Sequence, residues 1–109
     1  MMHEPAAAPF RFAISRALST AVVTIHGELD RPNVDRVAPV LRNVIADQDN
    51  KTVVVDLRDV SGVDPSATTL FHDALGWARR HGARFFLHAV PPVADTLAAE
   101  RSIREIILA

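Results

Sequence analysis

The sequence of 109 residues contains no cysteine. This absence excludes disulfide scaffolds, zinc fingers, iron–sulfur sites and thiol catalysis. The chain also lacks an excess of charge of one sign, because 12 Lys and Arg residues face 13 Asp and Glu residues, for a net charge of −1. Binding to nucleic acid independently of sequence needs a basic face. We therefore expect no direct nucleic-acid partner.

Long hydrophobic runs are also missing. The longest apolar runs, such as residues 52–55 and 85–87, have the length of strands, whereas a membrane-spanning helix needs roughly 20 apolar residues. The N-terminus has no basic region followed by an apolar core, so it does not resemble a signal peptide. We expect a cytoplasmic protein without membrane insertion.

The length suits one folded domain. Residues 1–9 are rich in Ala and Pro, which offer little surface to bury and few backbone donors, so they predict a flexible N-terminal arm. Residues 10–109 then form a single domain.

Four segments have the pattern of strands. Alternating apolar and polar side chains predict a first strand near residues 10–15, and β-branched side chains predict a second over residues 21–26 that ends at Gly27. A continuous apolar run predicts a third strand over residues 51–57, buried on both faces as in the centre of an α/β sheet. Residues 84–88 predict a fourth strand.

The first helix follows the second strand. Its apolar stripe consists of Val34, Val37, Leu41, Val44 and Ile45. Asn33 is a suitable N-cap, but Pro39 is unfavourable inside a helix. The helix is therefore expected to start at Asn33 with a bend at Pro39, or to start nearer Asp35.

A second helix is predicted over residues 65–81, closed by Gly82, and a third over residues 93–100. The tail at residues 103–108 fits a helical turn or a short strand equally well. Helices that alternate with strands after an opening hairpin indicate an α/β fold with parallel pairs. We expect a mixed sheet of four to five strands with three to four helices packed on it.

The junction before the second helix is the strongest candidate for a functional site. Residues 58–63 are predicted to form a loop after a buried strand, where α/β sheets hold their sites. Asp64 is the expected N-cap and Pro65 the first helical residue. Ser66 then lies in the first turn, where free N–H groups and the helix dipole accommodate a phosphate. The same position suits plain capping, and the residues alone leave both interpretations open.

Two motifs resemble those of STAS domains. Residues 27–30 read Gly-Glu-Leu-Asp after a strand, and residues 53–67 read Val-Val-Val-Asp-Leu-Arg-Asp-Val-Ser-Gly-Val-Asp-Pro-Ser-Ala. The family has an apolar strand, Asp-Leu, a short loop, and then Asp-Ser-Ser-Gly or Asp-Ser-Ala-Gly at the start of a helix. The resemblance extends over residues 10–108 and implies a STAS-like fold.

Stand-alone STAS domains of this length resemble bacterial anti-sigma factor antagonists. The resemblance implies partner switching: the antagonist binds an anti-sigma factor that is also a serine kinase, and phosphorylation of a serine at a helix start dissociates the complex and so regulates transcription. Ser66 matches that serine, and Asp64 and Asp30 match acidic residues near it. The implied partner-binding residues are Asp30, Asn33, Gly62, Asp64, Pro65, Ser66, Ala67 and Thr69.

Two residues depart from the family pattern. Pro65 stands where the family has a small residue, and Ala67 stands where it has glycine. Both reduce the conformational freedom of the segment that a kinase has to draw into its active site.

The alternative function is an accessory STAS subunit that binds the ATPase of an ABC-type lipid transport system, with no need for phosphorylation. A monomer or weak homodimer is expected in either case.

Other candidate sites favour structural interpretations. His26, His72, His81 and His88 lack the spacing of metal ligands, and no cofactor is expected. The sequence has no Gly-x-Ser-x-Gly motif, so we expect no hydrolase and no other enzyme activity. Trp77 flanks the apolar stripe of its helix and is expected to be half-buried.

Overall fold

The computed structural model describes residues 9–108. Its sheet has the strand order β1-β2-β3-β4-β5, which is also the order along the chain. The strands are β1 (Arg11–Ala17), β2 (Thr20–Leu29), β3 (Thr52–Val63), β4 (Arg84–His88) and β5 (Ile107–Leu108). β1 is antiparallel to β2, and each later pair of neighbours is parallel. The predicted mixed sheet is confirmed; residues 1–8 of the predicted arm lie outside the described residues.

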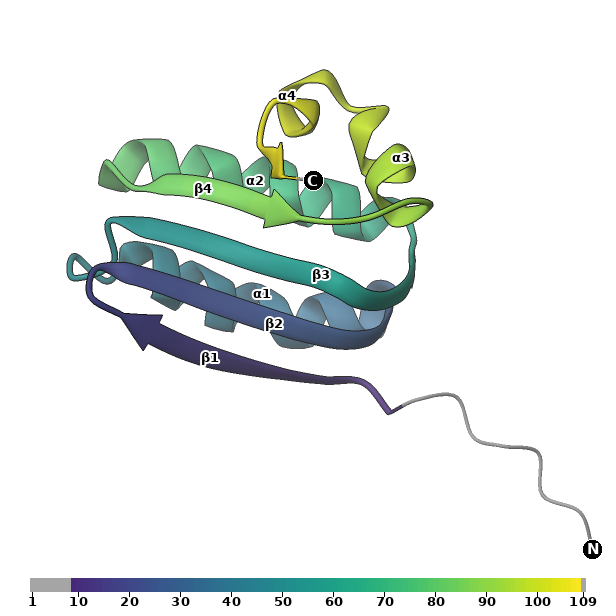
Figure 1. Cartoon of the computed structure of the whole chain (residues 1–109), viewed down its shortest axis with the longest axis horizontal. Coiled ribbons are helices and arrows are strands. Elements are labelled where there is room, and N and C mark those ends of the chain that lie inside the picture. The colour runs from purple at the N-terminus through teal and green to yellow at the C-terminus, as the bar shows by residue number, and fades with distance from the viewer. Residues whose placement is uncertain (1–8, 109) are drawn as a thin grey trace, which may run out of the picture.

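The helices lie mainly on one face of the sheet. α1 (Arg31–Ala46) connects β2 to β3, and α2 (Pro65–His81) connects β3 to β4, so the two cross the same face side by side (Figure 1). α3 (Val93–Ala98) and α4 (Arg101–Arg104) follow β4. The sequence left two possibilities for the tail, a helical turn or a short strand. The tail contains both, because β5 follows α4 and pairs with β4.

The core fills the space between the sheet and α1 and α2. Along β2, buried and half-buried side chains alternate, as expected when one face of a strand packs and the other does not. The helix stripes close the core from the other side. Its largest fully buried side chains are Phe71, Ile25, Leu29, Leu41, Ile45, Leu57, Leu87, Leu97 and Ile103.

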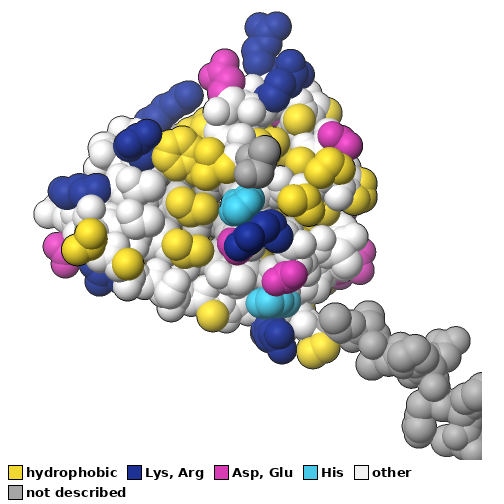
Figure 2. All heavy atoms as spheres, viewed as in Figure 1, with side chains coloured by type: hydrophobic (Ala, Val, Ile, Leu, Met, Phe, Trp, Pro, Cys, Tyr) yellow, Lys and Arg dark blue, Asp and Glu magenta, His cyan; other side chains and the backbone are white. Residues whose placement is uncertain are grey.

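The expectation that the third strand is buried on both faces is wrong. Thr52, Val54 and Asp56 of β3 are only half-buried, since no helix within residues 9–108 covers the side on which they lie. Figure 2 shows that side, where hydrophobic side chains lie among histidine, basic and acidic ones. The strand is central in the order of the sheet, but the molecule has a single helical layer behind it.

Two strands are longer than predicted. β2 does not end at Gly27 but continues to Leu29, and β3 includes residues 58–63, which were expected to be a loop. Gly27 has φ of +99°, and the pairing of β2 with β3 shifts register on both sides of residues 26–27. The glycine therefore allows an irregularity inside the strand and does not end it.

α1 starts earlier than predicted. Its N-cap is Asp30, not Asn33, and Pro32 occupies the first turn, where proline is tolerated. Pro39 lies inside the helix, which is continuous from Arg31 to Ala46. Pro39 and Asp35 are both exposed, so the carbonyl that the proline leaves unbonded faces water.

Gly27 provides a test of this fold. A Cβ at residue 27 would lie 3.1 Å from the backbone Cα of Phe10, in a conformation that L-residues rarely adopt. Gly27→Ala is expected to lower the free energy of unfolding by about 1–3 kcal/mol. The matched control is Gly62→Ala, because within residues 9–108 no atom other than those of its chain neighbours lies within 4 Å of a Cβ built there. Urea unfolding measures both variants, and equal stability of the two would contradict the described path of β2.

Candidate functional site

The parallel pairing of β2 and β3 brings the starts of α1 and α2 together. Leu29 and Val63, the last residues of the two strands, are partners in the sheet. The backbone N–H of Asp64 donates to the carbonyl of Leu29 over 3.2 Å. Asp30 and Asp64, which follow these strands, therefore occupy one edge of the molecule. The sequence motifs that contain them, separate in the chain, form one surface.

Asp30 fixes the start of α1. Its carboxylate accepts a hydrogen bond of 3.2 Å from the backbone N–H of Asn33, which satisfies one of the free donors of the first turn. The Asn33 side-chain amide donates to the carbonyl of Glu28 over 2.9 Å. Asn33 thus joins the helix start to the strand before it, and this contact explains why it is not the cap.

Asp64 fixes the start of α2 and binds Ser66 twice. Its carboxylate accepts from the backbone N–H of Ser66 over 2.9 Å and also from the Ser66 hydroxyl. The hydroxyl bond is the main cause that lowers the pKa of Asp64 below its ordinary value of 3.8. Desolvation, the second-largest cause, raises this pKa, and the backbone N–H groups of Ser66, Arg31 and Ala67 each lower it further.

This geometry fixes the direction of the Ser66 hydroxyl. The oxygen gives its hydrogen to Asp64, so its lone pairs face away from the carboxylate. A lowered pKa makes Asp64 a weak base, and its main effect on the hydroxyl is therefore to orient it. Ser66 is half-buried in the first turn of α2, where the positive end of the helix dipole favours added negative charge.

The predicted site residues are brought together, with one correction. Pro65 and Thr69 are exposed, and the Thr69 hydroxyl donates to the carbonyl of Pro65 over 3.3 Å. Gly62 is half-buried near the end of β3. Ala67 is fully buried, because it lies on the inner side of α2. The side chain of Ala67 therefore belongs to the core and not to the predicted binding surface.

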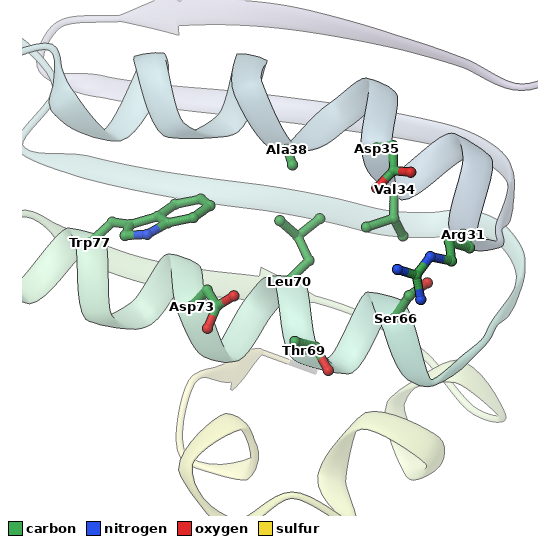
Figure 3. Close-up of a pocket in the computed structure, with 9 residues that line it drawn as sticks. All are labelled: Arg31, Val34, Asp35, Ala38, Ser66, Thr69, Leu70, Asp73 and Trp77. Atoms are coloured by element: carbon green, nitrogen blue, oxygen red, sulfur yellow. The ribbon is translucent and has the colours of Figure 1, made fainter.

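A groove between α1 and α2 extends from this surface. It has a volume of about 280 Å³. Figure 3 shows Ser66 and Arg31 at one end of it and Trp77 toward the other. The lining residues are Arg31, Val34, Asp35, Ala38, Ser66, Thr69, Leu70, Asp73 and Trp77.

Most residues that line this groove were not predicted from the sequence as site residues. Trp77 is half-buried as predicted, and the Arg42 guanidinium stacks over its ring at 5.4 Å. Arg31 directly follows the Gly-Glu-Leu-Asp motif, which was the available signal for its place beside Asp30. Asp35 and Asp73 gave no signal, because only the rotation of α1 against α2 shows which residues face the groove.

A polar chain outside this surface connects His72 and Ser102. His72 Nδ1 lies 3.2 Å from the Ser102 hydroxyl, and that hydroxyl donates to Glu100 over 3.1 Å. The single hydroxyl proton thus goes to the carboxylate, whereas a nucleophilic serine gives its proton to the imidazole. The contact joins α2 to α4 and does not activate Ser102.

Two features are absent from residues 9–108. In this range, no group of three or more His, Asp or Glu side chains is arranged to hold a metal ion. None of the helices in the same range has the length and the apolar composition needed to cross a membrane.

Comparisons with known proteins agree with this architecture. A family model described as "Mlab, STAS domain" matches residues 12–107. An anti-sigma factor antagonist from Mycobacterium paratuberculosis is 16% identical over 94% of this chain and 87% of that chain, with a TM-score of 0.79. The anti-sigma factor antagonist SpoIIAA in its unphosphorylated form is 17% identical over 90% and 86% of the chains, with a TM-score of 0.76.

RsbS from Moorella thermoacetica, in a variant with glutamate in place of a serine, is 24% identical over 91% of this chain and 86% of that chain, with a TM-score of 0.74. SpoIIAA from Bacillus has also been solved in a phosphorylated form, which superposes with a TM-score of 0.74. No curated protein matches the sequence. At these identities, the solved structures establish the fold that the chain shares with them.

The hydrogen bond between Ser66 and Asp64 predicts a measurable titration. Ser66→Ala removes the main cause of the lowered pKa of Asp64, so the NMR titration midpoint of this carboxyl is expected to rise toward 3.8. A carboxyl with a lowered pKa stabilises the fold above its unfolded pKa, and this contribution is lost as the pH falls through the folded pKa. The stability difference between wild type and variant should therefore be present at neutral pH and vanish in acid.

Ser61→Ala is the control for this titration, because Ser61 is an exposed serine on β3. It should leave the midpoint of Asp64 unchanged. An Asp64 midpoint that is the same in Ser66→Ala and wild type would show that the hydroxyl bond is absent in solution.

Proposed function

The chain belongs to the STAS domain family, and from this premise we propose that it is a bacterial, cytoplasmic anti-sigma factor antagonist. In this proposal the unphosphorylated protein binds an anti-sigma factor that is also a serine kinase. Binding releases the sigma factor, and phosphorylation of Ser66 by the kinase ends the interaction. The protein itself acts as a binding module and carries out no catalysis.

One observation carries this proposal. The Ser66 hydroxyl lies at the start of α2, oriented by Asp64, on the same edge as the start of α1. Ser66 lines the groove between α1 and α2, which has space for a phosphate, and the positive end of the helix dipole favours its charge. The chain shares its fold with SpoIIAA, with RsbS and with the antagonist from Mycobacterium paratuberculosis. SpoIIAA has been solved both with and without phosphate. These similarities support the same assignment.

The electrostatics explain how one modification would act as a switch. A phosphate adds about −1.5 to −2 charges near pH 7, against a net charge of −1 for the whole chain. Asp30 and Asp64 already make the surface acidic, so the added charge changes its potential sharply. In the transfer, a bond forms between Ser66 Oγ and the terminal phosphorus of the nucleotide, the phosphorus–oxygen bond to the leaving diphosphate breaks, and the hydroxyl proton is lost to solvent.

The proposed binding surface consists of the exposed and half-buried residues of the paired helix starts. They are Asp30, Asn33, Gly62, Asp64, Pro65, Ser66 and Thr69. Asp30 and Asp64 each cap a helix and also carry a negative charge. Asp30→Asn is therefore the informative change at the start of α1. Asn keeps the cap and removes only the charge.

A second candidate function is an accessory STAS subunit that binds the ATPase of an ABC-type transport system. The description of the matching family model names Mlab and does not name an antagonist. In addition, Pro65 and the buried Ala67 hold the start of α2 rigidly, which suits a permanent interface. Affinity capture from the native cells separates the candidates: recovery of a transporter ATPase without any kinase would refute the antagonist.

The antagonist predicts that a negative charge at residue 66 blocks binding. Ser66→Glu is expected to weaken binding to a purified kinase-type anti-sigma factor from the same cells by at least about tenfold, or about 1.4 kcal/mol. Ser66→Ala should bind as wild type does, since it carries no charge. Isothermal titration calorimetry measures both affinities.

The matched control is Ser19→Glu, which adds the same charge in the turn between β1 and β2, at an exposed residue outside the proposed surface. It should bind as wild type does. If Ser66→Glu also keeps the wild-type affinity, control of binding through residue 66 is wrong.

A further inference from the structure

Arg31 and Ser66 face each other across the mouth of the α1/α2 groove. Arg31 is the first residue of α1 and is exposed. In Figure 3 its guanidinium extends from the start of α1 toward Ser66 at the start of α2. Both residues line the groove, and Arg31 is the one positively charged residue among the described residues that do.

The guanidinium of Arg31 takes part in no ion pair within residues 9–108. The ion pairs of residues 9–108 join His26 to Asp59 and Arg58 to Asp56, and neither includes Arg31. Asp35, one turn further along α1, lines the same groove without forming an ion pair with Arg31. The guanidinium is therefore available to an anion at the mouth of the groove.

Phosphorylation would remove the contact that now holds Ser66. The Ser66 hydroxyl donates its only hydrogen to Asp64, and a phosphorylated oxygen has no hydrogen to donate. The phosphate would instead place at least one full negative charge beside the Asp64 carboxylate, and like charges at this distance repel. Rotation about the Ser66 side chain relieves this repulsion by turning the phosphate toward the groove.

We propose that Arg31 is the residue that receives a phosphate on Ser66, through a bidentate pair across the mouth of the groove. This inference rests on the proposed function, which supplies the phosphate. The planar guanidinium has the geometry that suits phosphate oxygens, and in Figure 3 it already extends toward Ser66. Arg31 is here a positioning residue that acts only in the modified state.

The pair would change the shape of the binding surface as well as its charge. Val34 and Leu70 form the floor of the groove near its mouth and are almost fully buried. An arginine fixed over the mouth by phosphate covers this floor. A partner segment that extends from the helix starts into the groove would then clash with Arg31. Phosphorylation therefore prevents binding of this segment both sterically and by charge repulsion.

The test uses the full chain with phosphoserine installed at residue 66 during synthesis, so that no kinase is needed. The second ionisation of the phosphate, which has a pKa near 6 in exposed sites, is followed by ³¹P NMR as the pH is varied. A paired guanidinium favours the dianion and lowers this pKa. The pKa is expected to be lower with Arg31 than in Arg31→Gln by about half a unit, or a factor of about three.

Arg36→Gln is the matched control, because Arg36 lies on the same helix but over the ring of Phe10, with 5.2 Å between guanidinium and ring centre. It should keep the low pKa of the unaltered protein. Arg31→Lys keeps the charge but not the bidentate geometry and should give an intermediate value. Gln and Lys are good helix formers, so circular dichroism should show all variants folded.

Equal phosphate pKa values in Arg31→Gln and the unaltered protein would overturn the role of Arg31. So would an equal effect of Arg36→Gln, since it would show a general influence of net charge. These results concern the phosphorylated protein alone. Failure of the proposed function appears separately, as a lack of binding between the unmodified chain and any kinase-type anti-sigma factor.

Discussion

Parallel pairing between β2 and β3 is the constraint on which the site depends. Two parallel neighbours that end at the same edge oblige the following helices to start side by side and to return across the same face. In this chain the pairing continues to Leu29 and Val63, and the bond from Asp64 to the Leu29 carbonyl extends it by one residue. The surface at the helix starts is therefore held by backbone hydrogen bonds and does not depend on a flexible loop.

Both helix starts use the same chemistry. An aspartate accepts from the first-turn N–H groups, and a proline follows within the first two helical residues. This arrangement satisfies donors that would otherwise be free and leaves two positive helix ends close together. Ser66 differs from its neighbours in one respect: its hydroxyl is bound to the cap itself. A change at this oxygen therefore alters the cap, the local charge and the mouth of the groove at once.

Local signals predicted α2 fully and α1 only in part. For α2, the cap Asp64, Pro65 and the closing glycine lie directly at the two ends of the apolar stripe. The local sequence pattern is therefore enough to predict where this helix starts and ends. For α1, both Asp30 and Asn33 are good caps, and the choice depends on the Asn33 side chain being bound to the carbonyl of Glu28. That contact exists only because β2 continues past Gly27.

The remaining differences are tertiary. The apolar run in β3 indicated burial, but it carried no information on whether a second layer covers the other face. The predicted site residues met at one edge because the motifs follow neighbouring strands. Arg31 and Trp77 came to face one groove through the rotation of α1 against α2, which periodicity within either helix does not determine.

In the proposed function, phosphate on Ser66 switches the surface at the helix starts. The intact mass of the protein, isolated from its own cells, tests it most directly. We expect a fraction of molecules heavier by one phosphoryl group, and we expect this fraction to be absent when the cells carry Ser66→Ala. A protein that is never phosphorylated under any growth condition, or whose phosphate persists in Ser66→Ala, would contradict it.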